Sequence, residues 1–202
     1  MGRTTIGPAS GKLGVLLPGM GAVATTFIAG VESARRGLTT PIGSLTQLGN
    51  IRLGKRTDNR QPKIKDFVPL AGLDQIVFGG WDPIPDNAYE SAVKAGVLET
   101  KHLEPIRDFL ESIKPMPAVF DKNYVRRLDG ENVKTGANKR ELAEQLREDI
   151  RRFKADNGCD RLVIVWCGST EIFLRSGPAH ATPEAFERAM EANDPEIAPS
   201  ML

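Results

Sequence analysis

An apolar run that ends in a glycine turn, near the start of the chain, narrows the possible folds more than any other segment. Residues Leu13–Ala24 are Leu-Gly-Val-Leu-Leu-Pro-Gly-Met-Gly-Ala-Val-Ala. The stretch Val15–Leu17 does not alternate between apolar and polar side chains, which is typical of a strand covered on both faces of a parallel sheet. Gly19, Gly21 and Ala24 have the spacing of a dinucleotide-binding turn, and a helical pattern follows them. The segment therefore predicts a first βα unit with an anion site at the start of its helix.

One part of the dinucleotide-binding pattern is missing. The pattern includes an acidic residue about 20 residues further on, at the end of the second strand, where it holds the ribose hydroxyls. We expect the second strand at Pro41–Thr46, but no acidic residue occurs between Glu32 and Asp58. A ribose carboxylate must therefore come from elsewhere. Asp82 is the nearest substitute, and a simple turn residue before Pro83 is an equally weighted alternative for it.

The rest of the chain alternates between strand and helix patterns. This alternation favours an α/β fold with a Rossmann-like, doubly wound parallel sheet in one domain over residues 1–202. Further strands are expected at 75–78, 118–120 and 162–166. Helices are expected at 88–95, at 101–113, after the capping residue Asn138 as far as Asn157, and after the Thr182-Pro183 pair. The basic segment at about 49–66 has little apolar content, so we expect a solvated loop there and give a phosphate or nucleic-acid patch less weight.

Composition limits the partners and the compartment. A net charge of +1 gives no reason to expect a nucleic acid or a membrane surface as a partner. No apolar stretch approaches the roughly 20 residues that a membrane-spanning helix needs, and the first residues lack the apolar core of a signal peptide. The two cysteines, Cys159 and Cys167, fit neither a disulfide framework nor a zinc site. We therefore expect a cytoplasmic protein with reduced thiols and no metal site.

The chemistry of such a fold gathers at one edge of the sheet. In an open parallel sheet, ligands bind beyond the carboxyl ends of the strands. The segments that this rule brings together are Gly19–Val23, Thr46-Gln47, Gly79–Asp82, Ala118–Asp121 and Cys167–Glu171. Thr170 and Glu171 could contact a ligand or cap the next segment, and both alternatives stay open here. His102 and His180 have no partners at a spacing that indicates a metal site or a catalytic triad.

Several of these motifs together resemble one family, the myo-inositol-phosphate synthases, also called inositol-3-phosphate synthases. The segments that carry the resemblance are Ile42-Gly-Ser-Leu-Thr-Gln-Leu48, Phe78-Gly-Gly-Trp-Asp82 with Ala88-Tyr-Glu90, Lys114-Pro-Met-Pro-Ala-Val119, Val165-Trp-Cys-Gly-Ser-Thr-Glu171 and Glu196-Ile-Ala-Pro-Ser200. Their order and spacing are similar to those of the family over essentially all 202 residues. This is far more specific than the glycine turn alone.

The resemblance implies an NAD+ site built from the same strand ends. The residues that would hold the cofactor are Gly19, Met20, Gly21, Ala22 and Val23 at the turn, Asp82 on the ribose side, Ala118 and Val119 beside the adenosine, and Cys167, Gly168, Ser169 and Thr170, which complete the cleft. Two segments depart from the family pattern. The family often has an Asn-rich glycine loop and a Thr-Ala-Asn-Thr-Glu segment, where this chain has Pro18–Val23 and Cys167–Glu171.

The resemblance also implies a reaction, a redox-neutral isomerisation of D-glucose 6-phosphate to 1D-myo-inositol 3-phosphate, the first step of inositol biosynthesis. It proceeds by oxidation, enolisation, intramolecular aldol closure and reduction. The family's catalytic lysines and aspartate lie beyond Ser200, so we expect the catalytic residues beyond residue 202. The chain is then the N-terminal, NAD-binding part of the enzyme and inactive by itself, and the full-length enzyme is a homotetramer.

Two other functions fit the cofactor motifs. One is a non-catalytic, NAD-binding regulatory module, and the other is the cofactor domain of an ordinary NAD(P) oxidoreductase. NADP is the weaker choice of cofactor, because Arg52 is only one of several basic residues after the expected second strand and Gln47 is neutral. Lysines and a phosphate-binding loop after Leu202 would favour the synthase over the regulatory module.

Overall fold

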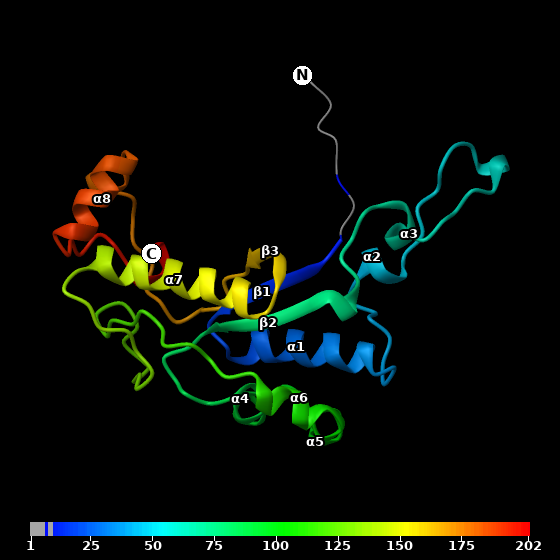
Figure 1. The fold of residues 1–202 in the computed structure, drawn as a ribbon, viewed down its shortest axis with the longest axis horizontal. Helices are drawn as coiled ribbons and strands as arrows, with labels where there is room; N and C mark the ends of the chain where they lie inside the picture. The colour runs from blue at the N-terminus through cyan, green and yellow to red at the C-terminus, as the bar shows by residue number, and fades with distance from the viewer. Residues whose placement is uncertain (1–6, 8–9) are drawn as a thin grey trace.

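The computed structural model describes residue 7 and residues 10–202. Its centre is a three-stranded parallel sheet with the order β2-β1-β3 (Figure 1). The strands are β1 (Lys12–Pro18), β2 (Ile76–Trp81) and β3 (Cys159–Ile164). In the sheet register Val15 of β1 lies opposite Phe78 of β2 and Val163 of β3. The apolar run before the glycine turn is therefore the central strand, as the sequence predicts.

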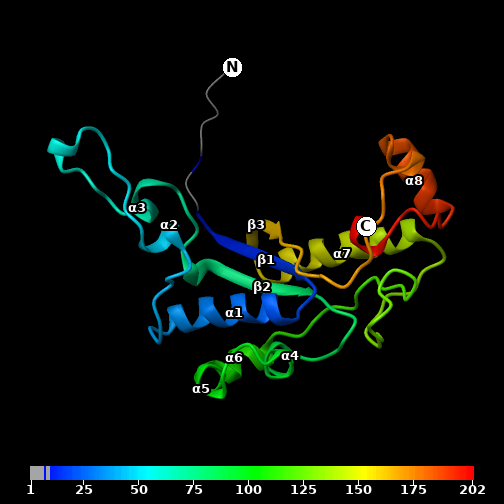
Figure 2. The ribbon, with the colours of Figure 1, turned by 180° about the vertical axis from the view of Figure 1, so that it is seen from behind.

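Helices cover both faces of this sheet, which confirms the doubly wound α/β fold (Figures 1 and 2). On one face lie α1 (Ala22–Arg35), α4 (Ala88–Ala95), α5 (Thr100–Leu103) and α6 (Arg107–Ser112). On the other face lies α7 (Lys139–Asp156), and α8 (Pro183–Glu191) packs against the beginning of α7. The expected caps are present, because Asn138 accepts a hydrogen bond from the Glu141 N–H group and Thr182 accepts one from the Ala185 N–H group.

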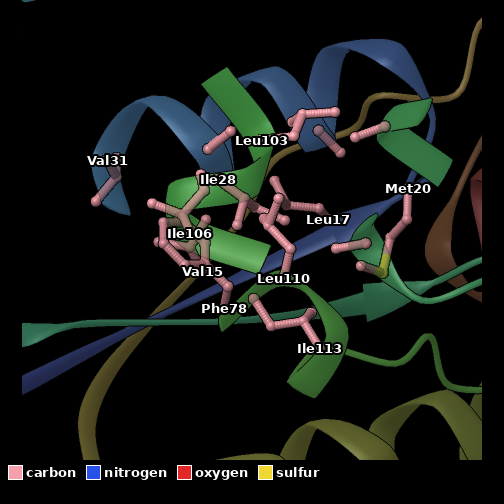
Figure 3. Packing of buried hydrophobic residues seen from close by; sticks show 14 residues of the cluster. Val15, Leu17, Met20, Ile28, Val31, Phe78, Leu103, Ile106, Leu110 and Ile113 are labelled. Atoms are coloured by element: carbon pink, nitrogen blue, oxygen red, sulfur yellow. The ribbon is translucent and has the colours of Figure 1, made fainter. Parts of the chain in front are cut away.

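The largest core cluster lies between the sheet and the helices α1 and α4–α6. Leu17 of β1, Ile28 of α1, and Leu110 of α6 are completely buried in it. Figure 3 shows these side chains converging with Phe78 of β2. Burial of each such side chain contributes about 1.5–3 kcal/mol. This cluster therefore fixes α1, and with it the glycine turn, against the central strand.

The opposite face has a smaller cluster. Leu16 of β1 and Trp81 of β2 are buried there against Leu146, Ile150 and Phe153 of α7. Leu146, Ile150 and Phe153 recur at helical spacing, and the sequence predicts them on the apolar face of this helix. This packing sets α7 directly beneath the end of β2.

The prediction of a second strand at Pro41–Thr46 is wrong. Residues 41–44 form an exposed turn, and α2 (Leu45–Leu48) follows it. The position next to β1, where the second strand of the pattern belongs, is taken by Ile76–Trp81. The segment from Leu38 to Leu70 instead projects from the sheet as a mostly exposed arm that includes the basic residues of 49–66 (Figure 1). Its short elements are η1 (Arg56–Asp58) and α3 (Ile64–Phe67), and η2 (Leu73–Gln75) leads back into β2.

The other differences from the expected elements have local causes. In the expected strand at 118–120, Ala118 makes only an isolated bridge to Val133. Met116, just before it, makes another to Trp81, and the flanking Pro115 and Pro117 have no N–H group to donate. The expected helix at 101–113 is divided into α5, η3 (Glu104–Ile106) and α6 around Pro105. The expected strand at 162–166 begins at Cys159, ends at Ile164 and lies at an edge of the sheet with several exposed residues. The remaining short helices are η4 (Pro178–His180) and η5 (Pro199–Met201).

No helix among residue 7 and residues 10–202 combines the length and the apolarity that crossing a membrane requires.

Candidate functional site

A cleft of about 450 Å³ lies at the carboxyl ends of the strands. Its walls come from the glycine turn after β1, the end of β2, segment 118–120, the segment after β3, and α7. The predicted cofactor residues that line it are Gly19, Gly21, Ala22, Val23, Asp82, Ala118, Val119, Cys167, Gly168, Ser169 and Thr170. Met20 is buried beneath the turn and borders a smaller neighbouring cavity instead, and Thr46-Gln47 lies in the arm, outside the cleft.

The two glycines of the turn differ in what surrounds them. Gly19 has φ +87°, and a Cβ atom there would lie 2.7 Å from the backbone nitrogen of Gly168. Only glycine fits both the backbone conformation and this close approach. A Cβ atom on Gly21 would meet no atom within 4 Å. Gly19 is therefore required by the fold, whereas Gly21 leaves open space at the start of α1.

The start of α1 has unsatisfied amide groups. Gly21 caps the helix without a side chain, and the first turn contains no acidic residue. The first bond of the helix runs from the Thr25 N–H group to the Gly21 carbonyl (3.0 Å). The N–H groups of Ala22, Val23 and Ala24 therefore point out of the end of a 14-residue helix. Together with the helix dipole, they form a site that favours an anion at the wall of the cleft.

Asp82 is tied to the glycine turn. Its Oδ2 atom accepts a hydrogen bond from the Met20 N–H group (2.6 Å), and its Oδ1 atom accepts one from the Ile84 N–H group (2.9 Å). Burial raises the pKa of this carboxyl above its ordinary value, and the two backbone hydrogen bonds oppose the rise. The hydrogen bond from the Ile84 N–H group shows that Asp82 is a turn residue, which was one of the two alternatives for it. The bond to Met20 shows that the same carboxylate also fixes the turn.

The raised pKa of Asp82 predicts a pH dependence of stability. The folded protein binds the Asp82 proton more tightly than the unfolded chain does, so the wild type loses stability as pH rises from the ordinary pKa of 3.8 through the raised value. In Asp82→Asn this contribution is absent. Urea unfolding of both proteins between about pH 3.5 and 7 should show the wild type losing stability relative to the variant. A stability difference that does not change with pH would contradict the burial of this charge.

The segment after β3 lies against the glycine turn. The Val165 N–H group donates to the Leu16 carbonyl (2.9 Å), and the Cys167 N–H group donates to the Pro18 carbonyl (2.9 Å). Cys167 thus lies beyond the end of β3, as the expected strand at 162–166 also implies. Burial raises the pKa of its thiol, which favours the neutral form. A neutral, half-buried thiol suits a wall of the cleft better than a nucleophile.

Glu171 caps a distant segment. Its Oε2 atom accepts a hydrogen bond from the Ser200 N–H group (3.0 Å), and its Oε1 atom accepts one from the Ser200 hydroxyl. The sequence left open a ligand contact or a cap on the next segment for Glu171, and the structure shows instead a contact to Ser200 from a residue that also lines the cleft. The contact brings Pro199, Ser200 and Leu202 to the cleft wall. The Glu196–Ser200 motif therefore closes one side of the cleft.

The sequence missed the contribution of α7. Leu146 and Ile150 line the cleft, although the helical spacing alone places them in the core. Between them, Asp149 accepts hydrogen bonds from the Trp81 indole N–H group (2.9 Å) and the Lys134 ammonium (2.6 Å). An acidic residue within an apolar helical stripe was the signal that could have identified it.

The two histidines have no part in the cleft. His180 accepts a hydrogen bond from the Gly177 N–H group (2.9 Å), and His102 lies exposed on α5. Within the described ranges, 7 and 10–202, no group of three or more His, Cys, Asp or Glu side chains could hold a metal ion.

Comparison with known proteins decides the family. A family model for an NAD-binding domain, described as myo-inositol-1-phosphate synthase, matches residues 13–202. The chain belongs to the myo-inositol-1-phosphate synthase family. This confirms the resemblance that the strand-end motifs carry, and it supports a dinucleotide as the cofactor of the cleft.

The individual proteins that the chain is similar to are also named inositol-3-phosphate synthases. The chain is 52% identical to inositol-3-phosphate synthase 1 of Bacteroides thetaiotaomicron over 98% of its length, which is 46% of that protein. It is 32% identical to inositol-3-phosphate synthase 1 of Oryza sativa subsp. japonica over 95% of its length, or 40% of that protein. The crystal structure of inositol-3-phosphate synthase from Caenorhabditis elegans is similar with a TM-score of 0.82 and 28% identity, covering 94% of this chain and 40% of that one. The chain thus spans less than half the length of these relatives.

Proposed function

We propose that the chain binds NAD+ in the cleft and is the cofactor-binding part of an inositol-3-phosphate synthase. That enzyme would form inositol 3-phosphate, the product in the names of the relatives, and its substrate would be D-glucose 6-phosphate. The observation that carries the proposal is the uncapped start of α1 beside the open space at Gly21. When bound, NAD+ would supply the group that accepts and returns a hydride.

The residues around the cleft suit the parts of a dinucleotide. The N–H groups of Ala22 and Val23 would donate to the pyrophosphate, for which the helix start provides a partial positive charge. The Asp82 carboxylate, held by the Met20 and Ile84 amides, would accept hydrogen bonds from the adenosine ribose. Ala118 and Val119 would contact the adenosine portion.

The other end of the cleft would receive the nicotinamide. Segment Cys167–Thr170 faces the glycine turn and supplies small side chains and backbone groups to the cleft wall. It would thus exclude water from the reacting end of the cofactor without adding a charge. We place the catalytic lysines and most of the glucose 6-phosphate site outside residues 1–202.

Binding can be tested directly by isothermal titration calorimetry of the 202-residue chain with NAD+. We expect saturable binding with one molecule per chain, and we expect ADP-ribose to compete because it carries the same pyrophosphate and ribose. Absence of heat up to about 1 mM NAD+, which corresponds to a binding free energy weaker than about −4 kcal/mol, would contradict the proposal. Inositol phosphate formation by these residues alone would contradict the placement of the catalytic groups.

We also propose that the complete enzyme is a homo-oligomer, a tetramer, in the cytoplasm. Exposed apolar side chains on and after β3 that lie outside the cleft, among them Val163, Val165 and Phe173, support further association. Cys159 and Cys167 are free thiols, which suit a reducing compartment. Size-exclusion chromatography with light scattering on the full-length enzyme tests the assembly.

A further inference from the structure

A smaller cavity of about 280 Å³ lies beside the main cleft. The two share the glycine turn and Asp82, and the smaller one adds Asp86, Ser91 and Lys94 to its walls. The Ser91 hydroxyl donates a hydrogen bond to the Met20 carbonyl (2.6 Å), so α4 is fixed against the turn. Because Asp82 lines both cavities, a ribose held at Asp82, as proposed above, would have this cavity beside it.

Two of the charged side chains at the smaller cavity, Asp86 and Lys94, form an ion pair. The Lys94 Nζ atom lies 2.6 Å from the Asp86 Oδ2 atom. The Lys94 side chain is 67% exposed and the Asp86 side chain is 18% exposed, so the carboxylate is the inner partner. Asp86 is also close enough to Asp82 for its charge to contribute to the raised pKa of that carboxyl. Two carboxylates therefore face the cavity, and one of them neutralises the lysine.

Lys94 has a particular place among the lining residues. Of the described residues that line either cavity, Lys94 alone carries a positive side chain, and arginine is absent from both linings. A 2′-phosphate on the adenosine ribose would bring a charge of about −2 and would need a cation or a bidentate guanidinium beside it. Here it would meet Asp82, Asp86 and a lysine that is already paired.

We propose that the Asp86–Lys94 ion pair makes the site select a dinucleotide that has no 2′-phosphate. The inference rests on the proposed function, because it places the adenosine ribose at Asp82. Asp86 pairs with the Lys94 ammonium, which would otherwise bind a 2′-phosphate. Its negative charge also repels that phosphate. Lys94 is then a latent phosphate ligand whose positive charge is balanced by its partner.

The proposal predicts that Asp86→Asn changes cofactor preference. The amide retains the size of the carboxylate, removes its charge and frees the Lys94 ammonium for a 2′-phosphate. We expect the ratio of NADP+ affinity to NAD+ affinity to rise about tenfold, as expected for one new charge-assisted hydrogen bond. Calorimetric titration of the wild type and the variant with NAD+ and with NADP+ measures this ratio.

Three further variants isolate the cause. Lys94→Gln should leave the affinity ratio at or below its wild-type value, and the double variant Asp86→Asn/Lys94→Gln should lose the gain of the single one. Glu99→Gln is the matched control, because Glu99 pairs with the exposed Lys101 (2.9 Å) away from both cavities and its removal changes the net charge equally. Its ratio should equal that of the wild type. Thermal unfolding of each variant shows that it is folded.

The outcomes separate the two proposals. If the wild type binds NAD+ and Asp86→Asn leaves the ratio unchanged, the role of the ion pair is overturned and the proposed function stands. An equal rise in Glu99→Gln would also overturn it, because net charge would then be the cause. If the wild type binds neither dinucleotide, both proposals fail.

Discussion

Gly21→Val is expected to lower the affinity for NAD+ by about 100-fold or more, while the free energy of unfolding falls by only about 1 kcal/mol because valine is a poorer helix cap. Gly21 has φ −83°, and a Cβ atom there would meet no atom within 4 Å. The valine side chain would instead occupy the space where we place the pyrophosphate, at the amides that start α1. A loss of about 100-fold corresponds to about 2.7 kcal/mol of binding free energy. Calorimetric titration with NAD+ and urea unfolding measure the two effects separately.

Gly30→Val is the matched control for this prediction. Gly30 is exposed in the middle of α1, and a Cβ atom there also meets no atom within 4 Å. It receives the same substitution on the same helix but lies away from the cleft, so the affinity for NAD+ should remain that of the wild type. Equal affinity of Gly21→Val and Gly30→Val would show that the dinucleotide does not cross the helix start.

The sequence predicts the first βα unit because local chemistry determines it. An apolar strand, a glycine with φ +87° and a helix without a capping side chain are all consequences of residues within 13–35. The same holds for α7 and α8, whose capping residues Asn138 and Thr182 accept the expected hydrogen bonds. Such features depend on neighbours in the chain and need no knowledge of tertiary packing.

The second strand could not be placed in this way. Counting from the glycine turn leads to Pro41–Thr46, because the pattern assumes a short connection after the first helix. Here the arm lies between α1 and the strand that pairs with β1, so that strand is Ile76–Trp81. Asp82 follows it directly. An acidic residue therefore follows the strand next to β1, displaced in sequence by the arm, which supports the ribose contact that we propose for Asp82.

The walls of the cleft were predicted in part. Strand ends meet at one edge of a parallel sheet, so the sequence could assign Ala118 and Cys167 to the same edge. The contacts from α7 and from Ser200 depend on how a helix and a distant segment fold back over that edge. No spacing rule in one sequence gives those contacts. The ion pair of Asp86 and Lys94 is of the same kind, since it links a loop to a helix eight residues on.

Asp149 of α7 makes one of these tertiary contacts, and the fold depends on it. Its side chain is 5% exposed and lies between Lys134, which is 8% exposed, and the buried Trp81. Its Oδ2 atom accepts from both of them, and its Oδ1 atom accepts from Arg152 (2.6 Å). Lys134 also donates its N–H group to the Ala118 carbonyl (2.8 Å). One buried carboxylate on α7 thus joins the end of β2 to the segment at Ala118, on two sides of the cleft.

Asp149→Ala is therefore expected to lower the free energy of unfolding by about 3–5 kcal/mol, because it leaves the Lys134 ammonium buried without a counter-charge. The Trp81 indole N–H group would also lose its acceptor. The matched control is Glu148→Ala on the same helix, where the carboxylate pairs with Arg151 and both side chains are more than 60% exposed. An exposed pair of this kind contributes at most about 1 kcal/mol. Urea unfolding followed by tryptophan fluorescence compares the two variants, and similar losses in both would show that the buried network does not hold α7 to the sheet.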